Sequence, residues 1–205
     1  ALATAFPAVL GTTQTSGSKN LDLLAYLPPT LEATAFQGDV VINEQRSANT
    51  LTMVPATRGS LSLLAHDSVV LNARIVMSDR DPATLPSAVA PEEQDLLAIL
   101  NPASSLLHAA VPLHTGDGTP ARIYAVNGDA QGVSLAFGDG NKNTFVDVPK
   151  AIVVKAGRDV SDLTIQAQHP DGADVSVVEA GRDVTFSSGS QRTNGDGIRI
   201  GGPGL

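Results

Sequence analysis

The chain has 205 residues, the length of one domain, and its 21 Asp and Glu against 13 Lys and Arg give a formal net charge of −8. This acidic balance argues against binding to a nucleic-acid backbone, which requires a basic surface. The absence of cysteine excludes disulfides, thiolate metal sites and a cysteine nucleophile, and no apolar run reaches the length of about 18 residues that a membrane-spanning helix needs.

Residues 1–30 are predicted to form a lead-in segment before the first regular coils. The apolar stretch 1–10 has no basic residues ahead of it, which is atypical of a signal peptide. The glycine-rich end, 201–205, falls within an apparent repeat. We therefore expect the chain to be an excised segment of a longer protein.

Residues 31–79 are predicted to form coils of a β-helix, because they repeat a strand–turn–strand pattern. A Gly-Asp turn begins the run 38–42, and in 59–71 two short apolar runs flank an Ala-x-x-x-Val turn. Glycine permits a positive φ, and an aspartate side chain can accept a hydrogen bond from the following backbone. Strands this short, separated by such turns, are typical of a chain that changes direction every few residues.

Residues 80–120 break the pattern and are predicted to be a proline-rich, partly helical insertion. A proline at position 91 and the two glutamates after it favour a helix start, and a leucine face follows. Asn101-Pro102 is expected to end this helix, and 104–110 to form a second short one. We expect the insertion to fold back with its leucine face on the coils and to carry recognition, because loops held on a rigid scaffold often do.

Residues 121–205 contain the strongest repeat in the chain and are predicted to form further coils. The octapeptides 153–160 and 177–184 differ only where one has Lys155 and the other Glu179, at a spacing of 24 residues. Such a period predicts a solenoid. Four β-branched runs are the expected strands: 152–154, 163–165, 175–178 and 184–186.

If one repeat is one coil, Lys155 and Glu179 stack on neighbouring parallel strands and point outward. Alternation then directs four apolar residues inward: Val154, Val178, Ala156 and Ala180. Stacked arginines at 158 and 182 would repel each other, so each is expected to turn toward an aspartate.

The histidines give little sign of catalysis or metal binding. His108 and His114 are six residues apart and make a poor metal pair, and His169 has no ligand-like neighbour. His66 and Asp67 are adjacent, so on a strand they are expected to point to opposite faces, which does not orient an imidazole. The sequence therefore predicts no catalytic, cofactor-binding or metal-binding residues.

One acidic stretch leaves an alternative open. From Asp139 to Asp147, oxygen-bearing side chains occupy relative positions 1, 3, 5 and 9, like the front half of a calcium loop. Thr144 and Lys150 stand where the glycine and the bidentate glutamate would be. A hydrophilic connection between two coils explains the stretch equally well. The other acids lie mainly in turns, which argues against a polysaccharide-cleaving carboxylate pair.

The repeated Ala-Gly-Arg-Asp-Val turns at 156–160 and 180–184 resemble those of filamentous-haemagglutinin-like exoproteins, the large secreted partners of bacterial two-partner secretion systems. The resemblance covers most of residues 20–205. Further segments carry it: Leu27-Pro28-Pro29-Thr30-Leu31, Gln37-Gly38-Asp39-Val40, 58–65, 77–83 and 197–204.

This resemblance implies an all-β fold, a right-handed parallel β-helix (β-solenoid), from a Gram-negative bacterium. It also implies an extracellular or outer-membrane location and an outer-membrane transporter as the partner in secretion. Members of the family act as adhesins, biofilm or matrix-binding proteins, haem-acquisition proteins or toxin-delivery stalks. We expect a non-enzymatic structural or adhesive segment without cofactors. One alternative is a glycan- or protein-binding module that uses the 80–120 insertion, and a more remote one is a polysaccharide-acting enzyme.

Overall fold

The computed structural model describes residues 25–43, 50–84, 109–132, 145–186 and 197–203. They form three parallel sheets, named here A, B and C, and one short 3-10 helix, η1 (Pro82–Thr84). Sheet A contains β1 (Ala25–Leu27), β4 (Thr50–Met53), β7 (Arg74–Met77), β10 (Phe145–Val148), β13 (Thr164–Gln168) and β16 (Ile198–Gly201). Sheet B contains β2 (Thr30–Ala35), β5 (Ser60–Ala65), β8 (Ala121–Ala125), β11 (Ile152–Ala156) and β14 (Val177–Ala180). Sheet C contains β3 (Val40–Asn43), β6 (Val69–Asn72), β9 (Ala130–Gly132), β12 (Val160–Ser161) and β15 (Val184–Thr185).

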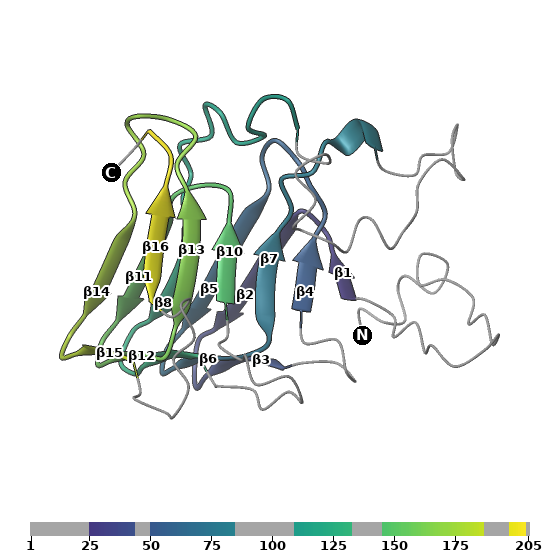
Figure 1. Ribbon diagram of the computed structural model, residues 1–205. Helices are drawn as coiled ribbons and strands as arrows, with labels where there is room; N and C mark the ends of the chain where they lie inside the picture. The colour runs from purple at the N-terminus through teal and green to yellow at the C-terminus, as the bar shows by residue number, and fades with distance from the viewer. Residues whose placement is uncertain (1–24, 44–49, 85–108, 133–144, 187–196, 204–205) are drawn as a thin grey trace, which may run out of the picture.

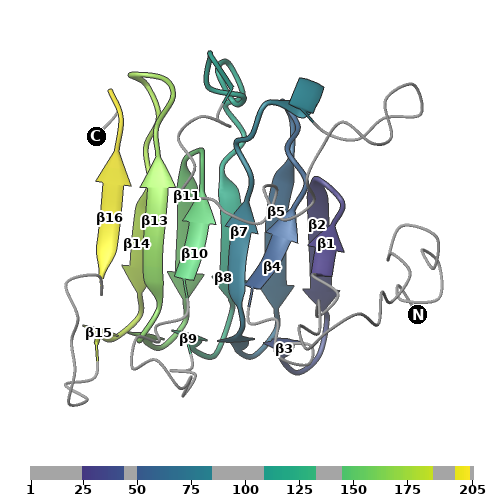
Figure 2. The same ribbon diagram turned by 45° about the vertical axis from the view of Figure 1, so that its right-hand side comes forward.

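The chain visits sheets B, C and A in that order and then begins the next coil, so every strand pairs with its equivalent in the neighbouring coil. Figures 1 and 2 show the resulting stack, with the coils following one another from the N-terminal to the C-terminal side. This arrangement is a parallel β-helix, as the sequence predicted. The described ladder begins with β1, which lies within the 1–30 segment and pairs with β4.

The core is the space enclosed by the three sheets, and aliphatic side chains fill it. Along β5 and β8, every second residue is buried, because successive side chains of a strand point to opposite faces of the sheet. Residues from all three sheets are fully or almost fully buried: Leu61, Leu63, Val69, Leu71, Ile75, Ile123, Val146, Ile152, Val154, Val160 and Ile165. An aliphatic core agrees with the composition, since only 3% of the residues are aromatic.

The two octapeptides lie one above the other. Lys155 is the Cα partner of Glu179, and their side chains form an exposed ion pair with 2.8 Å between Nζ and Oε2. Val154 and Ala156 on either side of Lys155 are buried in the core. The predicted register and the predicted facing of these residues are therefore confirmed.

The 24-residue period holds only between the last two coils. At the corner between sheets B and C, hydrogen bonds join equivalent residues of successive coils that are 29, 61, 30 and 24 residues apart. The strands keep their register while the connections vary in length, because a solenoid requires only that strands stack.

The longest coil contains the insertion, which leaves sheet A after β7 and enters sheet B at β8. Its departing and returning chains touch, because the backbone N–H of Ala109 donates to the carbonyl of Asp79 at 3.2 Å. The helix predicted after position 91 falls on residues 85–108, outside the described residues. Of the second predicted helix, 104–110, only Ala109 and Ala110 are described, and they are not helical.

Candidate functional site

The corner between sheets B and C, the B–C corner, is held by a ladder of side-chain acceptors. In successive coils, Asp39, Ser68, Asp129 and Asp159 each accept a hydrogen bond from the backbone N–H of the equivalent residue one coil later, at 2.8 to 3.2 Å. The last of these donors is the N–H of Asp183. Each polar side chain in the ladder thus fastens the next coil to its own, which explains the recurrent Asp in these turns.

Two arginines complete this ladder. Arg158 donates from Nε and Nη2 to the two carboxylate oxygens of Asp129, at 3.0 and 2.5 Å, and Arg182 binds Asp159 in the same way, at 3.1 and 2.6 Å. The hydrogen bonds from Arg158 hold the pKa of Asp129 below its usual value. The prediction that each arginine turns toward an aspartate is confirmed, and the aspartate belongs to the preceding coil.

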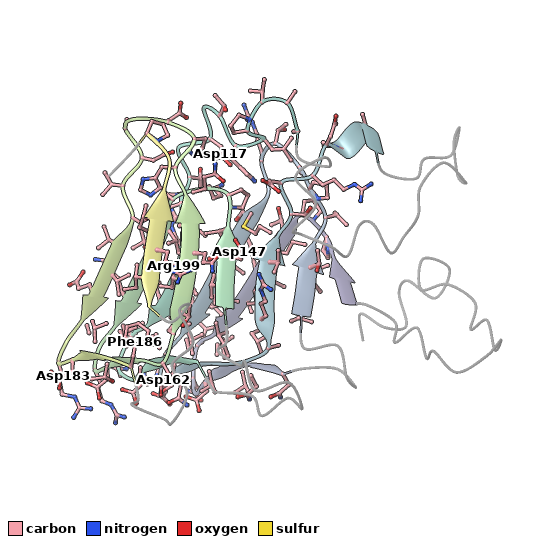
Figure 3. All side chains as sticks on the ribbon, in the orientation of Figure 1. Asp117, Asp147, Asp162, Asp183, Phe186 and Arg199 are labelled. Atoms are coloured by element: carbon pink, nitrogen blue, oxygen red, sulfur yellow. The ribbon has the colours of Figure 1, made fainter. Side chains whose placement is uncertain are left out.

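A second polar constellation lies at the corner between sheets A and B, the A–B corner, where the insertion rejoins the coils. Lys150, between β10 and β11, places Nζ 2.5 Å from Oδ2 of Asp117 and 3.1 Å from the carbonyl oxygen of Gly59. His114 Nδ1 lies 3.2 Å from the same Oδ2. We call Lys150, Asp117 and His114 the corner cluster. Figure 3 places Asp117 at the top of the stack and Asp183, on the B–C corner, at its lower left.

The corner cluster is almost closed to water. The side chains of Lys150 and His114 are each 1% exposed, and that of Asp117 is 11% exposed. Burial alone would raise the pKa of Asp117, but its hydrogen bonds with Lys150 and His114 hold the pKa below its usual value. Burial lowers the pKa of His114 against the opposing effect of Asp117. The neutral imidazole therefore carries its proton on Nδ1, because a carboxylate can only accept.

The insertion is tied to the coils on both sides of this cluster. Lys150 links Asp117 of the insertion to Gly59, in the A–B corner of an earlier coil. On the other side, the carboxylate of Asp171 accepts a hydrogen bond from the backbone N–H of Gly116 at 2.7 Å. The sequence did not single out the corner cluster, because Lys150 lies 33 residues from Asp117 and only the fold brings it to Asp117 and His114.

The stretch 139–147, for which calcium binding was left open as an alternative, lies mostly outside the described residues, since 139–144 are not among them. The last oxygen-bearing side chain of the stretch, Asp147, lies on the outer face of β10 and accepts a hydrogen bond from Arg74 Nη2 at 3.0 Å. Burial raises the pKa of Asp147, and Arg74 opposes this effect. Figure 3 shows Asp147 on β10, near the middle of sheet A. In the described ranges, no three His, Asp or Glu side chains are grouped as a metal site would require.

The other histidines have separate surroundings, and His108 lies outside the described residues. The expectation that His66 and Asp67 point apart is wrong: Nδ1 and Oδ1 are 2.7 Å apart, because both residues follow the end of β5 and occupy a turn. His169 is fully buried, with Nε2 2.8 Å from Oγ of Ser176. That hydroxyl also accepts the backbone N–H of Ile152, so it fastens one coil to the next.

Among the described residues, no helix is long and apolar enough to cross a bilayer. No family model, curated protein or solved structure matches the chain.

Proposed function

We propose that the chain is a non-catalytic structural and adhesive segment of a large secreted bacterial surface exoprotein. In this proposal the coils form a scaffold, and the insertion at 80–120 provides a surface that binds a glycan or protein on a host or bacterial cell. The observation that carries the proposal is that the insertion interrupts a coil without interrupting the sheets.

The strand pairing continues across the insertion. β5 pairs with β8 over four residues in register, from Ser62 with Arg122 to Ala65 with Ala125. On sheet A, β7 pairs with β10. A segment that leaves the stack and returns to the same point can vary without cost to the scaffold, which is how binding loops are commonly carried.

At the B–C corner, the carboxylates of the acceptor ladder have structural partners that favour a scaffold over a catalytic groove. Asp129 and Asp159 each accept hydrogen bonds from a backbone N–H and an arginine of the next coil, so their carboxylates stabilise the stacking of the coils. Secretion through an outer-membrane transporter and a location at the surface of a Gram-negative cell are part of the proposal. They rest on the resemblance of the Gly-Arg-Asp turns and on the absence of cysteine.

Replacing residues 85–108 with a short Gly-Ser linker tests the proposal, because the contact between Asp79 and Ala109 shows that the two ends can be joined. The matched control replaces residues 133–144, the connection from β9 to β10, with the same linker. Attachment of the purified chains to immobilised cell-surface glycans and to whole cells would be measured, with circular dichroism as a check of folding. We expect attachment to be lost only in the first variant. Equal attachment of both variants would contradict the proposed role of the insertion.

A further inference from the structure

The corner cluster holds a lysine and a carboxylate in contact where water is nearly excluded. Removing two charges from water is costly, and a hydrogen-bonded pair recovers this cost only with good geometry. The exposed pair Lys155–Glu179 in the same protein has side chains that are 51% and 62% exposed, so it does not incur this cost. The corner cluster is therefore a costly arrangement for a simple ion pair on the edge of a loop.

We propose that Lys150 and Asp117 become joined by an amide bond between Nζ and Cγ, an intramolecular isopeptide bond, with His114 as the proton relay. The proposal rests on the position of three buried groups on one oxygen atom. Oδ2 of Asp117 lies 2.5 Å from Nζ of Lys150 and 3.2 Å from Nδ1 of His114. The carboxyl carbon is one bond from that oxygen, so the nucleophile and the electrophile are already together.

Proximity of this kind accelerates a reaction between two groups. Groups held in reactive geometry behave as though their partner were present at effective concentrations of up to about 10⁵–10⁸ M. The contact with the Gly59 carbonyl fixes Nζ further, since it holds the side chain by a second hydrogen bond.

The reaction needs no oxidant and no further reactant. A proton first passes from the Lys150 ammonium to Oδ2 of Asp117, which leaves a neutral amine and a carboxylic acid. The nitrogen lone pair then forms the N–C bond at Cγ. The bond from Cγ to Oδ2 breaks with its electron pair, and Oδ2 takes a second proton from Nζ and departs as water. One water is lost, and one amide is formed.

His114 is placed to carry the second proton. Its Nδ1 touches the oxygen that departs, and its ring is buried, so exchange with solvent does not compete. A neutral imidazole can donate from Nδ1 to Oδ2 and then recover a proton from the amine nitrogen. The resulting bond would fasten the foot of the insertion to the coil, whether or not the insertion binds a ligand.

The test is the intact mass of the purified, folded chain of residues 1–205, followed by peptide mapping. We expect the mass to be one water below that of the sequence, trypsin to leave the bond after Lys150 uncut, and a branched peptide to contain both Lys150 and Asp117. Asp117 precedes a glycine and could instead lose water as a cyclic imide, so fragmentation of the branched peptide decides between them. A folded chain with the full sequence mass, or a water loss without the branch, would overturn the proposal.

Variants sharpen this result. Lys150→Arg keeps the charge but removes the nucleophile, so the branched peptide should vanish, whereas the matched change Lys155→Arg should leave it intact. His114→Gln should slow formation of the branch by about a hundredfold, the scale of proton-transfer catalysis. Unchanged kinetics in His114→Gln would remove the histidine from the mechanism. Because the wild-type mass is decisive, a variant that fails to fold does not leave the proposal undecided, and a negative result here does not bear on adhesion.

Discussion

At the B–C corner of the last two coils, the backbone approaches the preceding coil so closely that only glycine fits at one position. A Cβ added to Gly157 would lie 2.2 Å from the carbonyl oxygen of Val126, and one added to Gly181 would lie 2.1 Å from that of Gly157. Both glycines also donate a backbone hydrogen bond to the preceding coil: Gly157 to the carbonyl of Ala125, and Gly181 to that of Ala156. The glycine of the Gly-Arg-Asp turn is thus required by close packing of backbone on backbone.

Replacing Gly157 with alanine should therefore destabilise the fold. Inserting a methyl group into a filled space costs about 1–3 kcal/mol of unfolding free energy, because the neighbouring backbone must shift. The control is Gly172→Ala, since a Cβ there meets nothing within 4 Å, and it should change stability by less than about 0.5 kcal/mol. Urea unfolding of both variants checks this, and equal effects would contradict the close approach.

The buried His114 predicts a pH dependence of stability. Its pKa in the folded state lies below the usual 6.5, so between the two values the unfolded chain binds a proton that the folded chain does not. The free energy of unfolding should therefore fall as the pH is lowered through 6.5 and stay level above it. In His114→Leu this part of the decline should disappear. An identical pH profile for the variant, measured by urea unfolding from pH 8 to 5, would contradict the burial of a neutral imidazole.

At the scale of the strands and turns, the acceptor ladder shows which half of each Asp–Arg pair matters for stacking. Asp129 accepts three hydrogen bonds, two from Arg158 and one from the backbone N–H of Asp159. Its side chain is 17% exposed, whereas that of Arg158 is 53% exposed. The Asp129 carboxylate therefore holds the backbone of the next coil, and the Arg158 guanidinium shields this carboxylate from solvent.

This difference predicts unequal effects of two alanine substitutions. Asp129→Ala should lower the unfolding free energy by about 1–3 kcal/mol, because it leaves a part-buried N–H without its acceptor. Arg158→Ala should change stability little, since water can replace an exposed guanidinium. Asp129→Asn, which keeps an acceptor oxygen, should fall between them. Thermal unfolding of the three variants decides, and a larger effect of Arg158→Ala would contradict the ladder.

The facing and the pairing of the strands were largely predictable from the sequence, because both depend on patterns within a few neighbouring residues. Alternation in the octapeptides fixed which side of β11 faces inward, and the stacked charges at 155 and 179 fixed its partner. The His66–Asp67 contact could not be predicted because it depended on whether β5 ends at Ala65. The corner cluster could not be predicted for a different reason: Lys150 and Asp117 lie 33 residues apart, and no sequence pattern links them.

At the scale of the whole molecule, each coil covers the core of the coil before it. Ile165 in β13 is fully buried, whereas its partner Ile198 in β16 is 39% exposed, and Val160 and Val184 on sheet C differ in the same way. Among the described strands, β1, β2 and β3 at one end of the stack and β14, β15 and β16 at the other pair on one side only. Stability should therefore be graded along the stack.

Amide hydrogen exchange should reveal this gradient. Strands in the middle, β5, β8 and β11, have partners on both sides, so their N–H groups should be the slowest to exchange. Those of β14 to β16 should exchange faster, because opening the last coil breaks one interface instead of two. Uniform protection across all coils would contradict a molecule built from neighbour-to-neighbour contacts.

The stacking of the coils can be measured directly because the chain contains no cysteine. Cysteines introduced at Lys155 and Glu179 would lie on paired strands, with a separation of about 4.8 Å that suits a disulfide. The control pair, Thr34 and Glu179, shares the same outward row but is separated by three intervening strands, roughly 19 Å. Under mild oxidation, titration of free thiols should show a disulfide in the first pair and free cysteines in the second. Free thiols in the first pair of a folded chain, or equal bonding in both pairs, would contradict the parallel stack.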